Sequence, residues 1–363
     1  MKRRQLLSTG LALAFGRPVC ADRSQENLEL ASKVLATAVD SMQIESAALY
    51  VRQQSHEFIR CYGRATSPDA SFLLASISKP ITVAAVMTLF DRGEFRLHDP
   101  VRRFLPEFRG DGRDRITMQQ LFTHCSGLPD QLPENTRLRA AHAPLAEFVS
   151  QAIRTPLLFP PGSKFGYSSM AILLASEVAQ RISGQSISKL VQEAVVQPLK
   201  LKHTALGVGD LDRDTLVRCQ TTNSAPESGA GNKGTTSWDW NSEYWRQLGV
   251  PWGGAHGSAP DVGRFLTEFL GAEGRVLKPT TARMMTHNHN PAGIRARGLG
   301  FDLGRGLNGP PRPEVFGHSG STGTLCWVDP HSRTVCVILT TLPGRAANPH
   351  PRKAASEYVA RNC

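Results

Sequence analysis

The most constraining feature of this 363-residue chain is an S-x-x-K pair, Ser76 and Lys79, at the start of an apolar run. Residues 80–90 repeat apolar side chains at helical spacing, and Gly93 is a typical helix terminator. Three residues apart on a helix, Ser76 and Lys79 share one face. A serine hydroxyl becomes a nucleophile when a nearby base takes its proton, and lysine is such a base only where burial or positive charge lowers its pKa. The pair therefore indicates either nucleophilic chemistry or an ordinary buried helix start.

Size and charge bound the class of protein. The chain can form one large domain or two closely joined parts, and its 40% hydrophobic and 20% charged residues are ordinary for a globular protein. The formal net charge of +11 includes a local run of arginines within residues 102–115. That run has no interleaved aromatic residues and no nucleic-acid motif, so we interpret it as a solvated basic face. We expect no nucleic-acid partner, and the oligomeric state is open.

The N-terminus has the pattern of an export signal over residues 1–21. A positively charged start is followed by an apolar stretch, residues 6–15, and by a small-residue cleavage site. Arg3 and Arg4 also resemble a twin-arginine signal. The apolar stretch is too short to span a bilayer, so no stable membrane insertion is expected. We expect the Sec or twin-arginine route to export the protein to the periplasm or the medium, with a mature N-terminus near Asp22.

Strand signals stand at both ends of the chain, with helical signals between them. Apolar periodicity predicts helices at 26–42 and 352–361, and strands at 47–51, 57–62, 298–303, 324–328 and 334–339. This order predicts an α+β fold, in which N- and C-terminal segments build one antiparallel sheet flanked by helices, with an inserted mostly helical region. The α/β part would comprise residues 22–98 and 237–363, and the insertion residues 99–236.

Cysteine and histidine spacing gives no metal site. The chain has seven cysteines, and those after the predicted cleavage point lack metal-ligand spacing. Cys326 and Cys336 flank a predicted hairpin turn and could face each other across the strands, although two buried free thiols are the favoured interpretation. His287 and His289 have no third ligand nearby in the sequence, which is typical of a surface loop. We therefore expect no metal and no cofactor.

Two further stretches add weight to the S-x-x-K pair. Residues 160–169 contain Tyr167, and residues 316–323 contain a His-Ser-Gly sequence immediately before the predicted hairpin strands. Together with residues 116–129 and 251–258, these motifs make the chain resemble the serine β-lactamase and penicillin-binding-protein superfamily. In pattern it is nearest to class C β-lactamases, family VIII carboxylesterases and the related DD-peptidases and D-aminopeptidases. The resemblance runs from about residue 26 to the C-terminus.

The resemblance implies a role for each motif residue. Ser76 would be the nucleophile, Lys79 its helix partner, and Tyr167 the active-site tyrosine, a phenol kept partly ionised by Lys79. Ser76 would attack a carbonyl, and water would then cleave the acyl-enzyme. The backbone N–H groups of Ser76 and Ser321 would form the oxyanion hole. The remaining family positions, which would bind substrate, are Ser169, His318, Ser319 and Gly320.

Two departures from the family pattern bear on the substrate. Ser169 stands where β-lactamases usually have the asparagine of Tyr-x-Asn, and His318 replaces the lysine of the Lys-Thr-Gly strand motif. His318 would offer a neutral hydrogen-bond donor at pH 7.5 where β-lactamases hold a cation for the substrate carboxylate. We therefore expect short esters to be preferred over β-lactams, with any β-lactam activity rising toward pH 6 as His318 protonates.

Three functional hypotheses follow. The favoured one is an exported serine hydrolase with carboxylesterase-like preference, acting on a small ester or amide or on a peptidoglycan-type peptide. The second is a class C-type β-lactamase or D-Ala-D-Ala peptidase. The third is a non-catalytic relative that binds the cell wall, which would have no need of Ser76, Lys79 and Tyr167 together. His124 and Cys125 could suggest a thiol enzyme, but the resemblance favours a structural turn at these residues.

Overall fold

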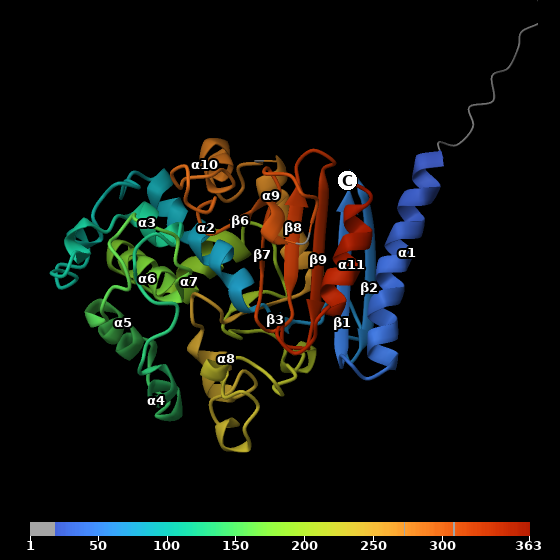
Figure 1. The fold of residues 1–363 in the computed structure, drawn as a ribbon, viewed down its shortest axis with the longest axis horizontal. Coiled ribbons are helices and arrows are strands. Elements are labelled where there is room, and N and C mark those ends of the chain that lie inside the picture. The colour runs from blue at the N-terminus through green and yellow to red at the C-terminus, as the bar shows by residue number, and fades with distance from the viewer. Residues whose placement is uncertain (1–18, 272, 308) are drawn as a thin grey trace, which may run out of the picture.

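The sheet predicted from the two ends of the chain is present. The computed structural model describes residues 19–271, 273–307 and 309–363. Six strands pair antiparallel in the order β2-β1-β9-β8-β7-β6, so that an N-terminal hairpin joins C-terminal strands through the β1–β9 pair (Figure 1). The strands are β1 (Ser46–Gln53), β2 (His56–Gly63), β6 (Asp302–Leu303), β7 (Phe316–Ser319), β8 (Leu325–Asp329) and β9 (Thr334–Thr340). The α+β prediction is therefore confirmed.

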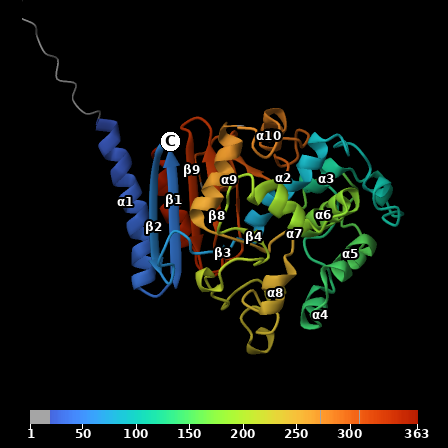
Figure 2. The same ribbon diagram turned by 180° about the vertical axis from the view of Figure 1, so that it is seen from behind.

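Both faces of the central strands are covered. Helices α1 (Val19–Asp40) and α11 (Pro351–Ala360) pack on one face, and α9 (Ala259–Gly271) packs on the other, as Figures 1 and 2 show from opposite sides. Alternate strand residues point into two hydrophobic cores, one on each face of the sheet. Leu49 and Ile338 join the core under α1 and α11, whereas Tyr50 and Val337 join the larger core on the face that α9 covers. A period of two is what a pleated strand requires when both faces are buried.

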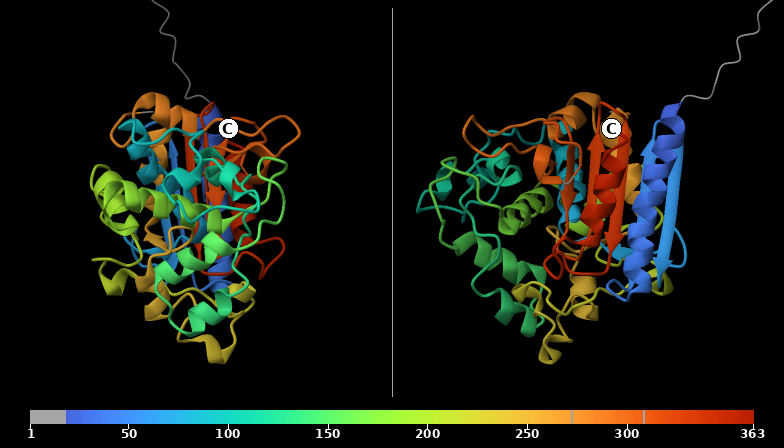
Figure 3. Two further views of the ribbon diagram at one scale, coloured as in Figure 1. Left: turned by 90° about the vertical axis from the view of Figure 1, so that its left-hand side faces the viewer. Right: turned by 45° about the vertical axis from the view of Figure 1, so that its right-hand side comes forward.

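The second part of the fold is mostly helical and surrounds α2 (Ser78–Asp91). Almost all of α2 is buried, as expected for a helix that is apolar on every side, and it packs against α6 (Ser169–Ser183) and α7 (Ile187–Val191). Figure 3 (left) shows this part from its outer side. Its other helices are α3 (Met118–Phe122), α4 (Asn135–Ala140), α5 (Leu145–Arg154), α8 (Glu243–Leu248) and α10 (Pro279–Met285). A small sheet joins β3 (Phe72–Leu73), β5 (Ala255–Gly257) and β4 (Ala205–Leu206).

The turn between β7 and β8 is tied to the chain just before Ser76. The Thr322 hydroxyl donates to the Leu73 carbonyl at 2.7 Å, and the Thr324 hydroxyl donates to the Leu74 carbonyl at 2.8 Å. Gly320 also touches this segment, since a Cβ there would lie 2.5 Å from the Leu74 oxygen. A side chain at position 320 would therefore force the two segments apart. These contacts join the sheet edge to the start of α2.

Two predicted secondary-structure elements differ from those in the structure. The strand predicted over 298–303 is wrong for residues 298–301, because only β6 is a strand. Gly300 has a φ of +82°, and a Cβ on Gly298 would lie 2.3 Å from the Met285 carbonyl oxygen, so these glycines form a turn packed against α10. The first helix begins at Val19, earlier than predicted.

Residues 1–18, most of the predicted signal, lie outside the described residues. Within the part described, no helix is long and apolar enough to cross a membrane.

The two hairpin cysteines do not face each other. In the β8–β9 register Cys326 lies opposite Val337, and Cys336 lies opposite Trp327. A shift of one residue places the two thiols on opposite faces of the sheet. Both are free and buried, so the favoured interpretation of two buried thiols is confirmed.

We predict that Thr322→Val lowers the free energy of unfolding by about 1–3 kcal/mol, because valine keeps the shape but leaves the Leu73 carbonyl without its hydroxyl donor. Denaturant unfolding measures this change. Thr267→Val is the matched control: its hydroxyl donates to the Gly263 carbonyl inside α9, where the helix supplies a backbone donor as well. Equal losses in the two variants would show that the tie to Leu73 adds nothing.

Candidate active site

Ser76 and Lys79 meet at the start of α2. Ser76 lies in a single 3₁₀ turn, η1 (Ala75–Ile77), that runs directly into the helix. The Lys79 ammonium group lies 3.1 Å from Ser76 Oγ and 2.8 Å from the Trp252 carbonyl oxygen, donating to both. The Lys79 side chain is 0% exposed, and burial lowers its pKa to about 7, although Asp130 opposes this effect. Lys79 therefore has the lowered pKa that a general base at neutral pH needs.

The turn that presents Ser76 is held by a second serine. Ala75, the residue before the nucleophile candidate, has a φ of +48°, a conformation that costs energy for any residue with a Cβ. The Ser78 hydroxyl donates to the Ala75 carbonyl at 2.6 Å and accepts the Ala255 N–H at 2.9 Å. Strand β5 thus braces the strained turn through Ser78.

Tyr167 lies beside both residues, just before α6. Its hydroxyl is hydrogen-bonded to Ser76, and its ring centroid lies 4.8 Å from Lys79 Nζ. Burial raises the pKa of the Tyr167 phenol, although Arg297 and the hydrogen bond with Ser76 partly oppose this. The expectation of a partly ionised phenol is therefore wrong: desolvation outweighs the nearby cations, and Tyr167 is a neutral hydroxyl. Such a group can carry a proton between Ser76 and a leaving group.

His124 positions the turn that carries Tyr167. The buried His124 ring accepts the Ser168 N–H through Nδ1 at 3.2 Å, and its backbone carbonyl accepts the Gly166 N–H at 2.9 Å. The ring centroids of His124 and Tyr167 are 4.6 Å apart. Cys125 is buried, and its thiol lies 3.2 Å from Asn290 Oδ1. These contacts support the structural-turn interpretation of His124 and Cys125.

Ser169 is engaged by an aspartate. Its hydroxyl and its N–H both donate to Asp130 Oδ1, at 2.7 and 3.0 Å, and the side chain is buried. Asp130 in turn raises the pKa of Lys79. Position 169, which the resemblance assigns to substrate, therefore orients a carboxylate near the base. Sequence reasoning missed Asp130, because no motif marks it.

His318 is neutral, and both its ring nitrogens are occupied. Arg297 Nη2, which can only donate, lies 2.9 Å from His318 Nε2, so Nδ1 carries the proton and donates to the Ser319 carbonyl at 2.8 Å. Burial lowers the pKa of His318 to about 3; Asp302 opposes this, and Arg297 adds to it. The ring therefore has no free donor for a substrate, and protonation of His318 gives no reason to expect β-lactam activity to rise toward pH 6.

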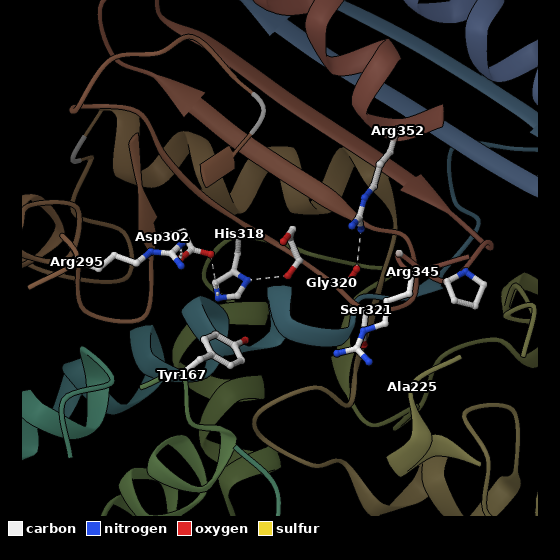
Figure 4. A pocket seen from close by; sticks show the side chains of 12 residues that line it. Tyr167, Ala225, Arg295, Asp302, His318, Gly320, Ser321, Arg345 and Arg352 are labelled. Atoms are coloured by element: carbon white, nitrogen blue, oxygen red, sulfur yellow. Dashed lines mark hydrogen bonds and ion pairs between the residues drawn. The ribbon is translucent and has the colours of Figure 1, made fainter. Parts of the chain in front are cut away.

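A cavity of about 380 Å³ opens in front of these groups (Figure 4). Its wall comprises Tyr167, the 318–321 segment and several arginines. Arg352 Nη1 donates to the Gly320 and Thr324 carbonyls, both at 2.7 Å, and so fixes the turn that contains Ser321. Arg345 stands exposed at the other end of the cavity from Arg295. Among the described residues it has no ion pair or hydrogen bond.

Of the predicted residues, Tyr167 and the 318–321 segment line the cavity, and Ser76 and Lys79 lie beside Tyr167. Ser76, Lys79 and Tyr167 form one hydrogen-bonded group, and the 318–321 segment borders it. The buried ion pair of Arg297 and Asp302 was missed, because neither Arg297, just before the glycine-rich turn, nor Asp302, the first residue of β6, belongs to a recognisable motif. Within the described ranges, no three His, Cys, Asp or Glu side chains lie close enough together to hold a metal ion.

Comparison with known proteins agrees with this geometry. Residues 31–360 match the family model described as Beta-lactamase, so the chain belongs to the β-lactamase family of serine hydrolases, which includes the penicillin-binding proteins. The fold and the site define the same class.

Particular relatives are esterases and peptidases. The chain is 31% identical to esterase EstB of Burkholderia gladioli over 73% of each chain. It is 28% identical to the D-alanyl-D-alanine-carboxypeptidase/endopeptidase AmpH of Escherichia coli, over 56% of this chain and 57% of that protein. Its fold is similar to that of EstCE1, a hydrolase with promiscuous acyltransferase activity, with a TM-score of 0.74 and 21% identity over 92% of this chain and 99% of that one.

We predict that a fluorophosphonate labels Ser76 at a rate that rises with pH through a midpoint near 7, because Lys79 must lose its proton to act as base. Stopped labelling reactions followed by mass spectrometry measure this rate. Ser76→Ala should abolish labelling, and Lys79→Ala should cost nearly as much, because groups that act together are not additive. A pH-independent rate between 5 and 9 would remove Lys79 from the role of base.

Proposed function

We propose that this serine hydrolase cleaves an ester or amide through an acyl-enzyme on Ser76, with a carboxylesterase-like preference. The single observation that carries the proposal is the hydrogen-bonded group of Ser76, Lys79 and Tyr167 at the edge of the cavity. A buried lysine with a pKa near 7, within 3.1 Å of a serine hydroxyl, has no structural purpose that an apolar residue would not serve better. This argues against a purely binding relative.

The residues would divide the reaction as follows. Neutral Lys79 takes the Ser76 proton while Oγ bonds to the substrate carbonyl carbon, and the carbonyl oxygen becomes an oxyanion held by the N–H groups of Ser76 and Ser321. As the bond to the leaving oxygen or nitrogen breaks, that atom receives the proton, which Tyr167 relays from Lys79. Water then attacks the acyl carbon and gives a proton to Lys79. As the bond from that carbon to Ser76 Oγ breaks, Oγ takes the proton, and the acid product leaves.

Preference for esters follows from the neutral charge and the occupied ring nitrogens of His318. Neither ring nitrogen is available to a substrate carboxylate, and the ring carries no charge near neutral pH. A short neutral ester requires only the nucleophile, the base and the oxyanion donors. The relative EstB, which is named as an esterase, supports this reading.

A second candidate, a β-lactamase or D-Ala-D-Ala peptidase, is favoured by Arg345. Both substrate classes carry a carboxylate, and Arg345 is a cation on the cavity wall without a partner among the described residues. The relative AmpH is named as a D-alanyl-D-alanine-carboxypeptidase/endopeptidase. A peptidoglycan-type peptide would then be the substrate.

We predict that kcat/KM for p-nitrophenyl butyrate exceeds that for nitrocefin by about tenfold or more, because the strand lacks a charged donor for the carboxylate. Arg345→Ala should lower nitrocefin hydrolysis and leave the neutral ester nearly unchanged. Initial rates on one purified sample, from pH 6 to 9, test both statements. Efficient nitrocefin or D-Ala-D-Ala hydrolysis without ester turnover would establish the second candidate instead.

Export to the periplasm or the medium is also proposed, on the sequence pattern of residues 1–21. We predict that mass spectrometry of the protein from its native host finds an N-terminus near Asp22. A variant in which Arg3 and Arg4 are both lysine separates the twin-arginine route from Sec, since only the former needs the arginine pair. Recovery of the intact chain from the cytoplasm would contradict export.

A further inference from the structure

A buried ion pair lies directly behind the candidate active site. Arg297 is 0% exposed and forms an ion pair with Asp302, the first residue of β6. Its other terminal nitrogen donates to His318 Nε2 at 2.9 Å, and its guanidinium carbon lies 5.6 Å from the centroid of the Tyr167 ring. A second arginine, Arg295, reaches the same carboxylate at 3.3 Å from the solvent side. His318 gives strand β7 no positive charge, but the guanidinium of Arg297 supplies one behind the His318 ring.

We propose that Arg297 is a positioning residue for the Ser76 chemistry: held by Asp302, its guanidinium fixes His318 as the Nδ1–H tautomer and places a permanent positive charge behind Tyr167 and Lys79. The inference rests on the proposed function, in which Ser76 is the nucleophile and Lys79 its base. Arg297 itself cannot touch a substrate, because it has no exposed surface. It acts on the reaction through the groups in front of it.

The first consequence concerns His318. Because arginine can only donate, the contact at 2.9 Å forces Nε2 to be an acceptor and Nδ1 to be the donor to the Ser319 carbonyl. That second hydrogen bond holds the carbonyl one residue before Gly320, in the segment that leads to the Ser321 N–H. Arg297 thus orients the edge of β7 through the ring of His318.

The second consequence concerns the protonation of Lys79. The groups facing Lys79 are Asp130, His124 and Tyr167 from the segments around α3 and α6, Arg297 and Asp302 from the β6 region, and His318 from β7. Burial is the main cause of the lowered pKa of Lys79; the two carboxylates raise the pKa, and Arg297 lowers it. We therefore expect removal of Arg297 to raise the pKa of Lys79 and removal of Asp302 to lower it.

The test is the pH dependence of fluorophosphonate labelling in five variants. Labelling reads the activation of Ser76 whatever the natural substrate is, so it separates this inference from the choice between ester, β-lactam and peptide. Arg297→Gln should move the midpoint to higher pH; for a shift of about one pH unit, labelling at pH 6.5 slows about eightfold, while rates at pH 9.5 converge. Asp302→Asn should move the midpoint the opposite way, and Arg297→Gln/Asp302→Asn should lie between the two single variants.

Arg295→Gln is the matched control. Arg295 contacts the same Asp302 oxygen, but its side chain is 52% exposed and screened by water, so its loss should shift the midpoint far less than loss of Arg297. Arg297→Lys keeps the charge and should restore the midpoint without restoring the full rate, because the two-pronged contact with Asp302 and His318 is lost.

Opposite shifts in the two single variants cannot come from a damaged fold, which would lower the rate at every pH. If Arg297→Gln does not fold, Asp302→Asn still gives the direction of its own shift, and Arg297→Lys should keep the midpoint of the unaltered protein. Shifts in the same direction, or a uniform loss of rate with an unchanged midpoint, would overturn the proposal and make the ion pair purely structural. Absence of any labelling in the unaltered protein would instead overturn the proposed function.

Discussion

The burial of Lys79 beside Ser76 is the interaction on which the rest of the site depends. An ammonium group without solvent exposure is costly, and the protein accommodates it by lowering its pKa to about 7 and by giving it the Trp252 carbonyl and the Ser76 hydroxyl as partners. Trp252 lies 173 residues from Lys79 in the sequence, so this contact forms only when distant segments of the chain have come together. Stability and reactivity therefore share the same contacts.

Backbone strain before Ser76 and close packing at the β7–β8 turn hold the segments around Ser76 in place. Ala75 adopts a left-handed conformation to present Ser76, and Ser78 holds the turn against β5. On the opposite side, Thr322 and Thr324 fasten the β7–β8 turn to the carbonyls just before Ala75. The proposed oxyanion donors at positions 76 and 321 are thus built from two segments joined by buried hydrogen bonds, which is how donors are kept in place before charge develops.

Much of this could be predicted from the sequence, because the relevant signals were local. Helical spacing placed Ser76 and Lys79 on one face, and strand signals at both ends of the chain predicted one shared antiparallel sheet, which the structure joins through the β1–β9 pair. The electrostatics could not be predicted in the same way. Whether Tyr167 is ionised depends on desolvation against cations from distant segments, and the occupation of both His318 nitrogens depends on Arg297, which no motif identifies. The ionisation of Tyr167 and the hydrogen bonds of His318 thus both depend on residues that lie far away in the sequence.

The proposed function requires that Ser76 becomes covalently acylated during turnover. The most direct measurement is intact-mass and peptide-mapping mass spectrometry of the protein quenched in acid during hydrolysis of p-nitrophenyl butyrate. We expect a single added butyryl group, located on the peptide that contains Ser76, which disappears as the ester is consumed. An acyl group on another residue, or turnover that persists in Ser76→Ala, would contradict it.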